Sequence, residues 1–391
     1  MEQEIKELST PALLDFASEI AMHDSRIERC RIHEGRTIAF ITLCAVLSGY
    51  GTWDEIHVYA ECKKSLMEEY LGELVSVPSA DTFNRFFSLL KPERFEGVYR
   101  EWISDVLSLR SANKRRLASG EVIAVDGKEL CGASSAGGSP LRMVSAFAVD
   151  SGLSLGQVEV GAKSNEIPAV QDLVSELDIK GCTITADAMH CQRKTCETVI
   201  DNGGDFFLFV KENQHSLLQA VKCAVDAAKS HPRNNNDAYG QLDDKRRSHQ
   251  VYRGCVAVGE KLYLGTQLDR WPHVESFGVV VSERFEKGRL VKEERHFITS
   301  LKMDARRFLE ISRKHWGIEN GLHRRLDMDF KEDSSRKRKN AAVNFSLINK
   351  IAMAILRLDT AKKEAWVRKR QRASLDDNYL RYLLDMGKDI I

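Results

Sequence analysis

The stretch that decides the fold is Glu121-Val122-Ile123-Ala124-Val125-Asp126, a short apolar run that ends on a carboxylate. Its β-branched residues favour a buried strand. Two further strands are predicted at Arg142–Val149 and Leu155–Val160, joined through the tight-turn sequence Asp150-Ser151-Gly152. We therefore expect three consecutive strands that form a meander.

The pattern after the meander alternates between helix and strand. A helix is predicted at Ala169–Leu177, a strand at Cys182–Ala186, a helix at Gln192–Ile200 and a strand at Asp205–Val210. This alternation is typical of a mixed sheet covered by helices. The expected fold class is therefore α/β.

Helical periodicity dominates both ends of the chain. Residues 1–118 predict a helical N-terminal domain, in which Arg85 and Arg94 lie on two short helices that could dock on DNA or belong to a plain bundle. Residues 301–391 predict helices again, with a strong amphipathic stretch at Ala341–Leu358. We expect residues 119–233 to form the first part of the α/β core, which residues 301–391 complete.

Short strands replace this pattern between residues 234 and 300, which predicts a β-rich insertion. The strands expected there are Gln250–Val258, Lys261–Thr266, Phe277–Ser282 and His296–Thr299.

Charge is balanced overall but not along the chain. The chain has 58 Lys and Arg against 57 Asp and Glu, whereas residues 331–372 carry 13 against 4. Smaller basic clusters lie at residues 26–36 and 110–116. A cationic segment of this kind indicates a polyanion partner such as nucleic acid, although a solvated helix face gives the same pattern.

Composition argues against membrane and secreted proteins. The longest mostly apolar run, Ile38–Leu47, is shorter than the roughly 18 residues of a membrane span. The N-terminus is acidic and lacks the layout of a secretory signal. The nine cysteines contain no Cys-x-x-Cys pair, so we expect reduced thiols and a cytoplasmic protein.

Two carboxylates are expected to meet at one edge of the sheet. Asp126 is predicted to end the first strand and Asp187 the fourth, and these strands lie side by side if the fourth runs parallel to the first. Unpaired carboxylates this close repel each other, so the pair requires a cation. Mg²⁺ or Mn²⁺ suits hard oxygen ligands, and two such ions can promote phosphoryl transfer. The alternative is that each Asp is a turn residue.

A third carboxylate is expected from the helical segment His315-Trp316-Gly317-Ile318-Glu319-Asn320-Gly321-Leu322-His323. Trp316, Ile318 and Leu322 are predicted to pack on the sheet while Glu319 faces its edge. Residue chemistry alone does not choose between Glu319 and the acidic residues that follow it, Asp327, Asp329, Glu332 and Asp333.

Several motifs together resemble those of DDE insertion-sequence transposases, in particular the ISAs-type group with its H-repeat-associated proteins. The resemblance spans Arg36 to about Leu384. The motifs are Ile123–Lys128, Val144–Phe147, Lys163–Pro168, Asp187–Met189, Val210–Gln214 and His315–His323.

This resemblance implies a ribonuclease H-like core, DNA strand cleavage and joining, and two divalent ions, Mg²⁺ or Mn²⁺. It assigns catalysis and metal binding to Asp126, Asp187 and Glu319, with the β-rich insertion between the second and third. The implied partners are the terminal inverted repeats and target DNA, bound by a homodimer that associates with the nucleoid. The expected DNA contacts are Lys128, Lys163, Lys211, Asn213, Asn320, His323, Arg336, Lys337, Arg338 and Lys339.

The chain departs from the family pattern at two places. The insertion has Lys245-Arg246-Arg247-Ser248-His249 where the family usually has a His-Gly-Arg-x-Glu motif, and Arg324 stands where the family often has Trp. Two alternatives therefore stay open besides a transposase: a domesticated or decayed DNA-binding protein, and a nuclease that cuts without joining.

Overall fold

The computed structural model describes residues 12–110, 117, 120–134, 140–161, 165–230, 236–245, 249–267, 269–286 and 289–386. The chain divides into two compact units. The sheet unit comprises residues 117–128 and 144–322, and the helical unit comprises residues 1–116, 129–143 and 323–391. Apart from residues 129–143, the segments predicted as the first part of the core and as the β-rich insertion lie in the sheet unit.

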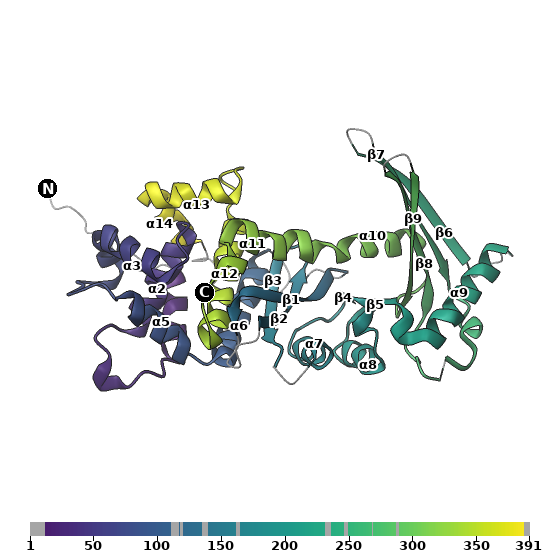
Figure 1. The fold of residues 1–391 in the computed structure, drawn as a ribbon, viewed down its shortest axis with the longest axis horizontal. Helices are drawn as coiled ribbons and strands as arrows, with labels where there is room; N and C mark the ends of the chain where they lie inside the picture. Colours follow the sequence, from purple (N-terminus) through teal and green to yellow (C-terminus); the bar gives the residue numbers. More distant parts are fainter. Residues whose placement is uncertain are drawn as a thin grey trace. The chain divides into compact units, whose positions relative to one another are not determined.

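A mixed sheet forms the framework of the sheet unit (Figure 1). Its strands follow the order β3-β2-β1-β4-β5-β9-β8-β7-β6. Residues 129–134 and 140–143, at the ends of β1 and β2, belong to the helical unit. The strands are β1 (Val122–Ser134), β2 (Pro140–Ala148), β3 (Leu153–Glu159), β4 (Thr183–Ala186), β5 (Asp205–Val210), β6 (Asn236–Lys245), β7 (His249–Val258), β8 (Ser276–Glu286) and β9 (Arg289–Thr299).

The centre of the sheet is parallel. Strand β4 pairs in parallel with β1 on one side and with β5 on the other. Strand β9 then pairs antiparallel with β5 and connects β8, β7 and β6 to the same sheet. The predicted α/β class and the predicted side-by-side placement of the first and fourth strands are both confirmed.

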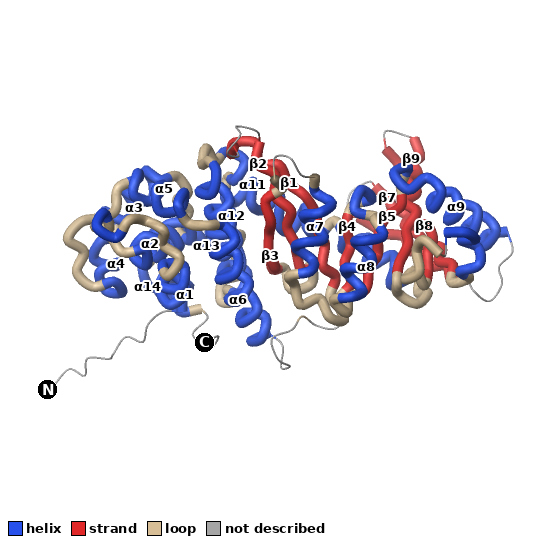
Figure 2. Tube along the Cα trace, turned by 90° about the horizontal axis from the view of Figure 1, so that it is seen from below, coloured by secondary structure: helices blue, strands red, loops and turns tan. Residues whose placement is uncertain are grey.

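Helices cover the two faces of this sheet. Figures 1 and 2 show α7 (Glu166–Ser175) and α8 (Arg193–Asp201) on one face, while α10 (Ala305–His315) lies on the other. Helix α9 (His215–Ser230) contacts β7, β8 and β9. Beneath α10, the rings of Phe207 and Phe297 stack with centroids 4.6 Å apart, and Phe308 packs on both. This aromatic core fixes α10 against the centre of the sheet.

Three expectations differ from the structure. Asp126 does not end its strand, because β1 continues to Ser134 while its partner β4 is only four residues long. The strand predicted at Lys261–Thr266 is a 3-10 segment, η4 (Lys261–Gln267); its apolar residues do not alternate in burial, since only Leu264 is buried and Leu262 is 77% exposed. Strand β6 and helix α9 were not predicted.

The helical unit packs around one central helix, α12 (Lys339–Leu358). This helix is long and apolar enough to cross a membrane, but 89% of its apolar window is buried inside the protein, as in a core helix. The other helices are α1 (Ala12–Ala21), α2 (Gly35–Leu47), α3 (Trp53–Cys62), α4 (Lys64–Leu71), α5 (Ala80–Leu89), α6 (Pro92–Arg110), α11 (Arg324–Phe330), α13 (Trp366–Leu375) and α14 (Asp377–Asp385).

Capping and buried hydrogen bonds define the ends of these helices. The hydroxyl of Ser79 accepts from the backbone N–H of Thr82 and caps α5. At the other end of α5, the buried side-chain amide of Asn344 donates to the carbonyls of Phe87 and Leu90, each at 2.9 Å. Asn344 therefore ties α5 to α12 and satisfies carbonyls that a helix end leaves open.

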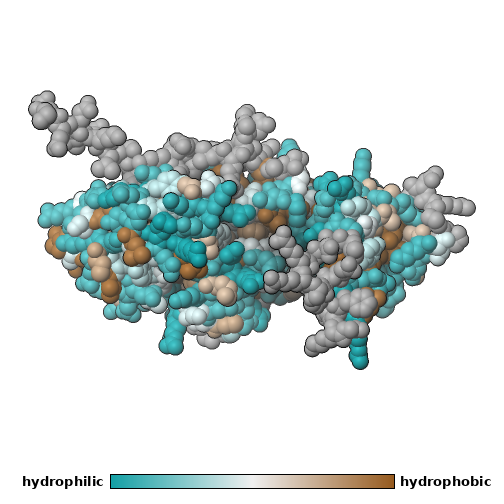
Figure 3. Space-filling model, turned by 90° about the horizontal axis from the view of Figure 1, so that it is seen from above, coloured by the Kyte–Doolittle hydropathy of each residue, from teal (hydrophilic) through white to brown (hydrophobic). Residues whose placement is uncertain are grey.

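The surface is mostly hydrophilic on the face that Figure 3 shows, with apolar residues interspersed among polar ones. Single exposed apolar side chains are normal for a folded protein. They give no reason to seek the functional site in an apolar patch.

Candidate active site

Two aspartates lie at the end of the parallel ladder between β1 and β4. The ladder runs from Val122 paired with Thr183 to Val125 paired with Ala186. Asp126 directly follows Val125, and Asp187 directly follows Ala186, so the two aspartates come next to each other at the end of this ladder. Asp187 leaves the sheet as the N-terminal residue of a short 3-10 turn, η2 (Ala188–His190). The fold thus brings together the pair of carboxylates that the sequence predicts.

The two aspartates have opposite electrostatic environments. Burial, repulsion from Asp187 and a smaller repulsion from Glu319 together raise the pKa of Asp126 to about 7. The backbone N–H of Gly127, 2.9 Å from Oδ1, only partly opposes this. The hydrogen bond from His315 is the main cause of a lowered pKa at Asp187, and Lys211 adds to it. Asp187 is thus stabilised as an anion, whereas burial and the neighbouring carboxylates disfavour the ionised form of Asp126.

His315, the last residue of α10, orients Asp187. Its Nε2 lies 3.2 Å from Oδ1 of Asp187, and its Nδ1 lies 3.3 Å from the hydroxyl of Thr185. A carboxylate only accepts, so Nε2 carries the proton of this bond. His315 is 5% exposed and packs edge-on against Phe209. His315 opens the motif His315–His323, but the sequence alone predicted no role for it.

Glu319 lies on a π-helical turn, η5 (Glu319–His323), that follows α10. Gly317 and Gly321 allow this segment to lie directly on the sheet: a Cβ on Gly317 would come within 2.5 Å of Val149, and one on Gly321 within 2.9 Å of Phe147. π-Helical turns are frequent at functional sites. Glu319 is exposed and near enough to raise the pKa of Asp126.

The apolar residues around Glu319 follow the prediction in part. Ile318 and Leu322 are buried, at 1% and 0% exposure. Trp316 is 37% exposed, and the guanidinium of Arg295 lies 4.5 Å from its ring centroid. Trp316 therefore covers a cation on β9 and keeps a solvent-facing surface, where the sequence predicted full packing on the sheet.

A glutamate that the sequence analysis did not single out also borders the site. Glu166 begins α7, and a Cβ on Gly127 would lie 2.4 Å from its Oε2, so the carboxylate reaches over the backbone next to Asp126. On its other side, Nε2 of His190 is 4.0 Å away. His190 is fully buried, and burial lowers its pKa to about 4. Only the small residue at position 127 hinted at this close approach.

Side-chain amides hold the turn that follows Asp187. Asn213 donates to the carbonyl of Ala188 at 2.8 Å, and Gln214 donates to the carbonyl of Cys191 at 3.0 Å. Both donors lie in η3 (Glu212–Gln214), just beyond β5 and Lys211. Asn213, expected as a DNA contact, thus also has a structural role in positioning the turn.

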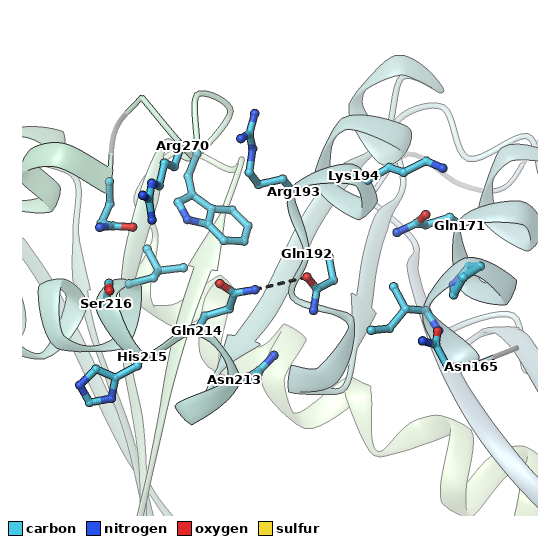
Figure 4. A pocket seen from close by; sticks show the side chains of 15 residues that line it. Asn165, Gln171, Gln192, Arg193, Lys194, Asn213, Gln214, His215, Ser216 and Arg270 are labelled. Carbon is cyan, nitrogen blue, oxygen red and sulfur yellow. Dashed lines mark hydrogen bonds between the residues drawn. The ribbon is translucent and has the colours of Figure 1, made fainter.

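These amides border a cavity of about 780 Å³ at the ends of β4 and β5 (Figure 4). In Figure 4, the side chains of Gln192 and Gln214 meet through a hydrogen bond, and Arg193 and Arg270 extend from the two sides. The described lining contains several amides and cations and no carboxylate. Amide donors and cations of this kind suit a phosphate-bearing ligand, although Arg193 also pairs with Glu197 and His215 with Glu212 outside the lining. The polar and cationic lining residues are Asn165, Gln171, Gln192, Arg193, Lys194, Asn213, Gln214, His215, Ser216, Gln267 and Arg270.

The acidic site fits a divalent cation in part. The raised pKa of Asp126 indicates carboxylates that a positive ligand would stabilise. Among the described residues, however, no group of three or more His, Cys, Asp or Glu side chains is arranged to hold a metal ion. The arrangement therefore offers the Asp126–Asp187 pair as a ligand set, with Glu319 nearby but not in place as a third ligand.

The other expected DNA contacts have varied surroundings. Lys128 lies on β1 two residues beyond Asp126, and Asn320 is exposed on the π-helical turn that His323 ends. Lys163 lies outside the described residues, as do Arg246, Arg247 and Ser248 of the insertion motif.

The basic segment of residues 331–372 is less exposed than its charge suggests. Arg336, Arg338 and Lys339 are exposed, whereas Lys337 is buried, with its Nζ donating to the carbonyl of Gly51 at 2.5 Å. The same ammonium lies over the rings of Trp53 and Phe345. Three more cations of this segment are buried: Lys350, Lys369 and Arg370. Lys337 is thus not on the surface where we expected a phosphate contact.

Comparisons with known proteins give a consistent result. A family model described as Transposase DDE domain matches residues 118–356, and one described as DDE_Tnp_1-associated matches residues 20–103. The "H repeat-associated putative transposase YhhI" of Escherichia coli K12 is 32% identical over 360 residues, 90% of this chain and 92% of that protein. The "Putative transposase YncI" of Escherichia coli O157:H7 is 32% identical over 385 residues, 96% of this chain and 95% of that protein.

One solved structure aligns with the chain more distantly. It is a piggyBac transposase synaptic complex with hairpin DNA, which covers 97% of this chain and 82% of that chain at 11% identity and a TM-score of 0.42. A likeness at this level is too weak to support a conclusion.

Proposed function

The chain belongs to the DDE transposase family, and from this premise we propose that it cuts DNA strands and joins the cut ends to new DNA. The observation that carries the proposal is the pair Asp126 and Asp187 at the end of the β1–β4 ladder, with Glu319 in electrostatic range. The order β3-β2-β1-β4-β5 around this pair supports a ribonuclease H-like core. We propose Asp126, Asp187 and Glu319 as the catalytic residues.

The family generally uses divalent metal ions, and we propose that two Mg²⁺ or Mn²⁺ ions bind here. When bound, such ions lower the pKa of a water nucleophile and stabilise the negative charge of a phosphate undergoing displacement. The carboxylates of Asp126 and Asp187 would hold them, with Glu319 completing the set. His315 keeps the Asp187 carboxylate in one orientation, so its oxygens are presented before substrate arrives.

Cationic and amide side chains around the acidic pair would position the DNA. Lys211, close enough to lower the pKa of Asp187, offers an ammonium at the same edge of the sheet. The cavity beside Asn213 offers amides and guanidinium groups for the backbone. In the helical unit, we propose contacts from the exposed Arg336, Arg338 and Lys339. Such contacts would make affinity for DNA fall steeply with salt.

The remaining expectations complete the proposal. We propose a homodimer on DNA, because joining two ends of one element requires two active sites in one complex. The DNA partners would be the terminal inverted repeats and the target, met at the nucleoid in the cytoplasm.

Nicking of a supercoiled plasmid in Mn²⁺ tests this function. The expected result is that the full-length protein nicks the plasmid, while Asp126→Ala lowers the rate by at least about a hundredfold and leaves DNA binding intact. Asp172→Ala, on an exposed surface of α7, serves as the matched control and should nick normally.

The outcomes separate the candidate functions. Equal nicking by the wild type and Asp126→Ala would indicate a contaminating nuclease and overturn the proposal. DNA binding without nicking would favour a protein that only occupies DNA. Nicking without joined products, assayed with DNA that carries the element's own flanking ends, would favour a nuclease.

A further inference from the structure

A histidine and a glutamate beside the acidic pair lie close together without a hydrogen bond between them. His190 is fully buried, and neither of its ring nitrogens has a hydrogen-bond partner within the part of the chain that the structure describes. Its Nε2 lies 4.0 Å from Oε2 of Glu166. Burying polar atoms without partners costs free energy, so this arrangement indicates a ligand that binds between the two side chains.

The distance between the two side chains excludes a direct bond. A hydrogen bond or a close ion pair would bring the ring nitrogen to within about 3.2 Å of the carboxylate oxygen, well below the observed 4.0 Å. Burial, against the opposing effect of Asp187, lowers the pKa of His190 to about 4. The ring is therefore neutral at pH 7, and one of its nitrogens carries a lone pair.

Two metal–ligand bonds fit the same gap. Bonds from a divalent ion to an imidazole nitrogen or a carboxylate oxygen are roughly 2.1 Å long, so an ion between the two atoms spans up to about 4.2 Å. Neutral imidazole is the commonest side-chain ligand of metal ions. The observed separation therefore matches an ion held between Nε2 of His190 and Oε2 of Glu166.

The backbone on both sides of His190 is fixed. Asn213 donates to the carbonyl of Ala188, two residues before it, at 2.8 Å. Gln214 donates to the carbonyl of Cys191, the residue after it, at 3.0 Å. A ligand group that is held in place before the ion arrives loses less conformational freedom on binding.

The glutamate is placed by the start of α7 and by a glycine. Asn165 caps α7 through its Oδ1, which accepts from the backbone N–H of Ile167 at 3.0 Å. The Glu166 carboxylate lies against Gly127, where a Cβ would come within 2.4 Å of Oε2 and 3.0 Å of Oε1. The Glu166 side chain is 25% exposed, so an ion can reach the pair from this side.

We propose that Glu166 and His190 bind a divalent transition-metal ion beside the acidic pair. Gly127, on which the Glu166 carboxylate lies, directly follows Asp126. An imidazole nitrogen suits a transition-metal ion better than Mg²⁺, which prefers oxygen ligands. Water and a phosphate oxygen of the substrate would complete the coordination of an ion that only two protein groups hold.

This inference deepens the proposed function, on which the role of the ion in DNA cleavage rests. It gives the motif at residues 163–168 a chemical part in the site. One carboxylate and a neutral imidazole attract a cation less strongly than two carboxylates do, so this site should fill at a higher Mn²⁺ concentration than the acidic pair.

Pulsed electron paramagnetic resonance of the full-length protein at saturating Mn²⁺ tests the site, because modulation of the electron spin echo detects nitrogen bound to the ion. We expect the coupling of a directly bound imidazole nitrogen in the wild type. Labelling the protein with [¹⁵N]histidine should replace the ¹⁴N coupling by that of ¹⁵N. This measurement needs no substitution, so folding does not affect it. If no histidine nitrogen couples to the bound Mn²⁺, the proposal is overturned.

Variants assign the coupled nitrogen to one residue. His190→Gln should abolish the coupling, whereas His315→Gln should keep it. Glu166→Gln removes the anionic ligand at nearly constant shape and should weaken the Mn²⁺ affinity of the nitrogen-coupled site about tenfold or more. Glu176→Gln, the same change at the exposed end of α7, should alter it by less than about twofold. Coupling that survives in His190→Gln, or equal affinity of the two glutamate variants, would contradict the proposal.

The outcomes separate this inference from the proposed function. A wild-type protein that nicks DNA in Mn²⁺ without coupling to a histidine nitrogen would refute the inference alone. Because the resonance measurement does not require catalysis, a protein that shows the coupling but does not nick would refute the proposed function alone.

Discussion

The sheet unit and the helical unit differ in how their buried charged side chains are stabilised. In the sheet unit, Asp126 and Asp187 lie at one edge, and burial together with repulsion from Asp187 raises the pKa of Asp126 to about 7. In the helical unit, Lys369 and Arg370 are buried yet bonded to carbonyls or a carboxylate. A perturbed pKa at carboxylates fixed side by side therefore indicates a ligand site, whereas charge counted along the sequence does not.

Removing the cation of a buried ion pair in the helical unit should have the largest effect on stability. Lys369 bonds the carboxylate of Asp359 at 2.9 Å and the carbonyl of Leu356 at 3.2 Å, and the Asp359 side chain is fully buried. Lys369→Met leaves that buried carboxylate without its cation, and we expect the free energy of unfolding to fall by about 3–5 kcal/mol. Hydrogen exchange of α12 amides measures the loss.

Arg368→Met is the matched control, because Arg368 is the exposed neighbour of Lys369. Its effect should stay within about 0.5 kcal/mol. If the α12 amides exchange at similar rates in Lys369→Met and Arg368→Met, the ion pair of Lys369 with Asp359 does not stabilise the helical unit.

The next largest effect should be a loss of metal affinity when His315, which orients Asp187, is removed. His315→Ala deletes the bond to Asp187, so the Mn²⁺ affinity measured by calorimetry should fall about 10–100-fold. His315→Gln, which keeps a donor, should recover part of this. His215→Ala, at an exposed histidine paired with Glu212, should leave affinity unchanged. Equal Mn²⁺ affinity of His315→Ala and the wild type would show that His315 does not prepare Asp187 for metal binding.

Neutralising one member of the acidic pair should stabilise the metal-free protein. In EDTA at pH 8, Asp126→Asn removes a buried charge that repels Asp187, so the free energy of unfolding of the sheet unit should rise by about 1–2 kcal/mol. Asp172→Asn on α7 should change it by less than about 0.5 kcal/mol. A destabilised Asp126→Asn would mean that the pair is already compensated within the protein.

The pH dependence of the free energy of unfolding should reflect the raised pKa of Asp126, with a smaller effect. The pKa of Asp126 is raised to about 7 in the folded protein, so between pH 4 and 7 the folded state binds more protons than the unfolded one. Stability in EDTA should therefore fall as pH rises through this window, by at most about 1.4 kcal/mol per pH unit from this group. Denaturation at a series of pH values should show this component in the wild type and not in Asp126→Asn. A pH-independent difference between the two would refute it.

The sequence predicted those features that local pattern determines. β-Branched apolar runs located β1 and β4, and the meander followed by a parallel strand predicted that Asp126 and Asp187 would meet. The third carboxylate was assigned by resemblance, and the glycines that let its helix approach the sheet, Gly317 and Gly321, explain its position only once Phe147 and Val149 are seen.

Features that depend on distant packing were beyond the sequence. The bond from His315 to Asp187 requires α10 to lie across the sheet, and the approach of Glu166 to Gly127 joins two separate motifs. The burial of Lys337 against Trp53 reverses what its neighbours in a basic run suggest. Each of these is set by tertiary contacts, which a residue's own neighbours do not encode.

Direct titration with Mn²⁺, followed by electron paramagnetic resonance of the free ion, tests the central claim that the acidic edge exists to hold divalent cations. We expect the wild type to remove Mn²⁺ from solution, Asp126→Asn and Asp187→Asn to lose most of this binding, and Asp172→Asn to keep it. Undiminished Mn²⁺ binding by both Asp126→Asn and Asp187→Asn would show that these carboxylates do not bind the ion.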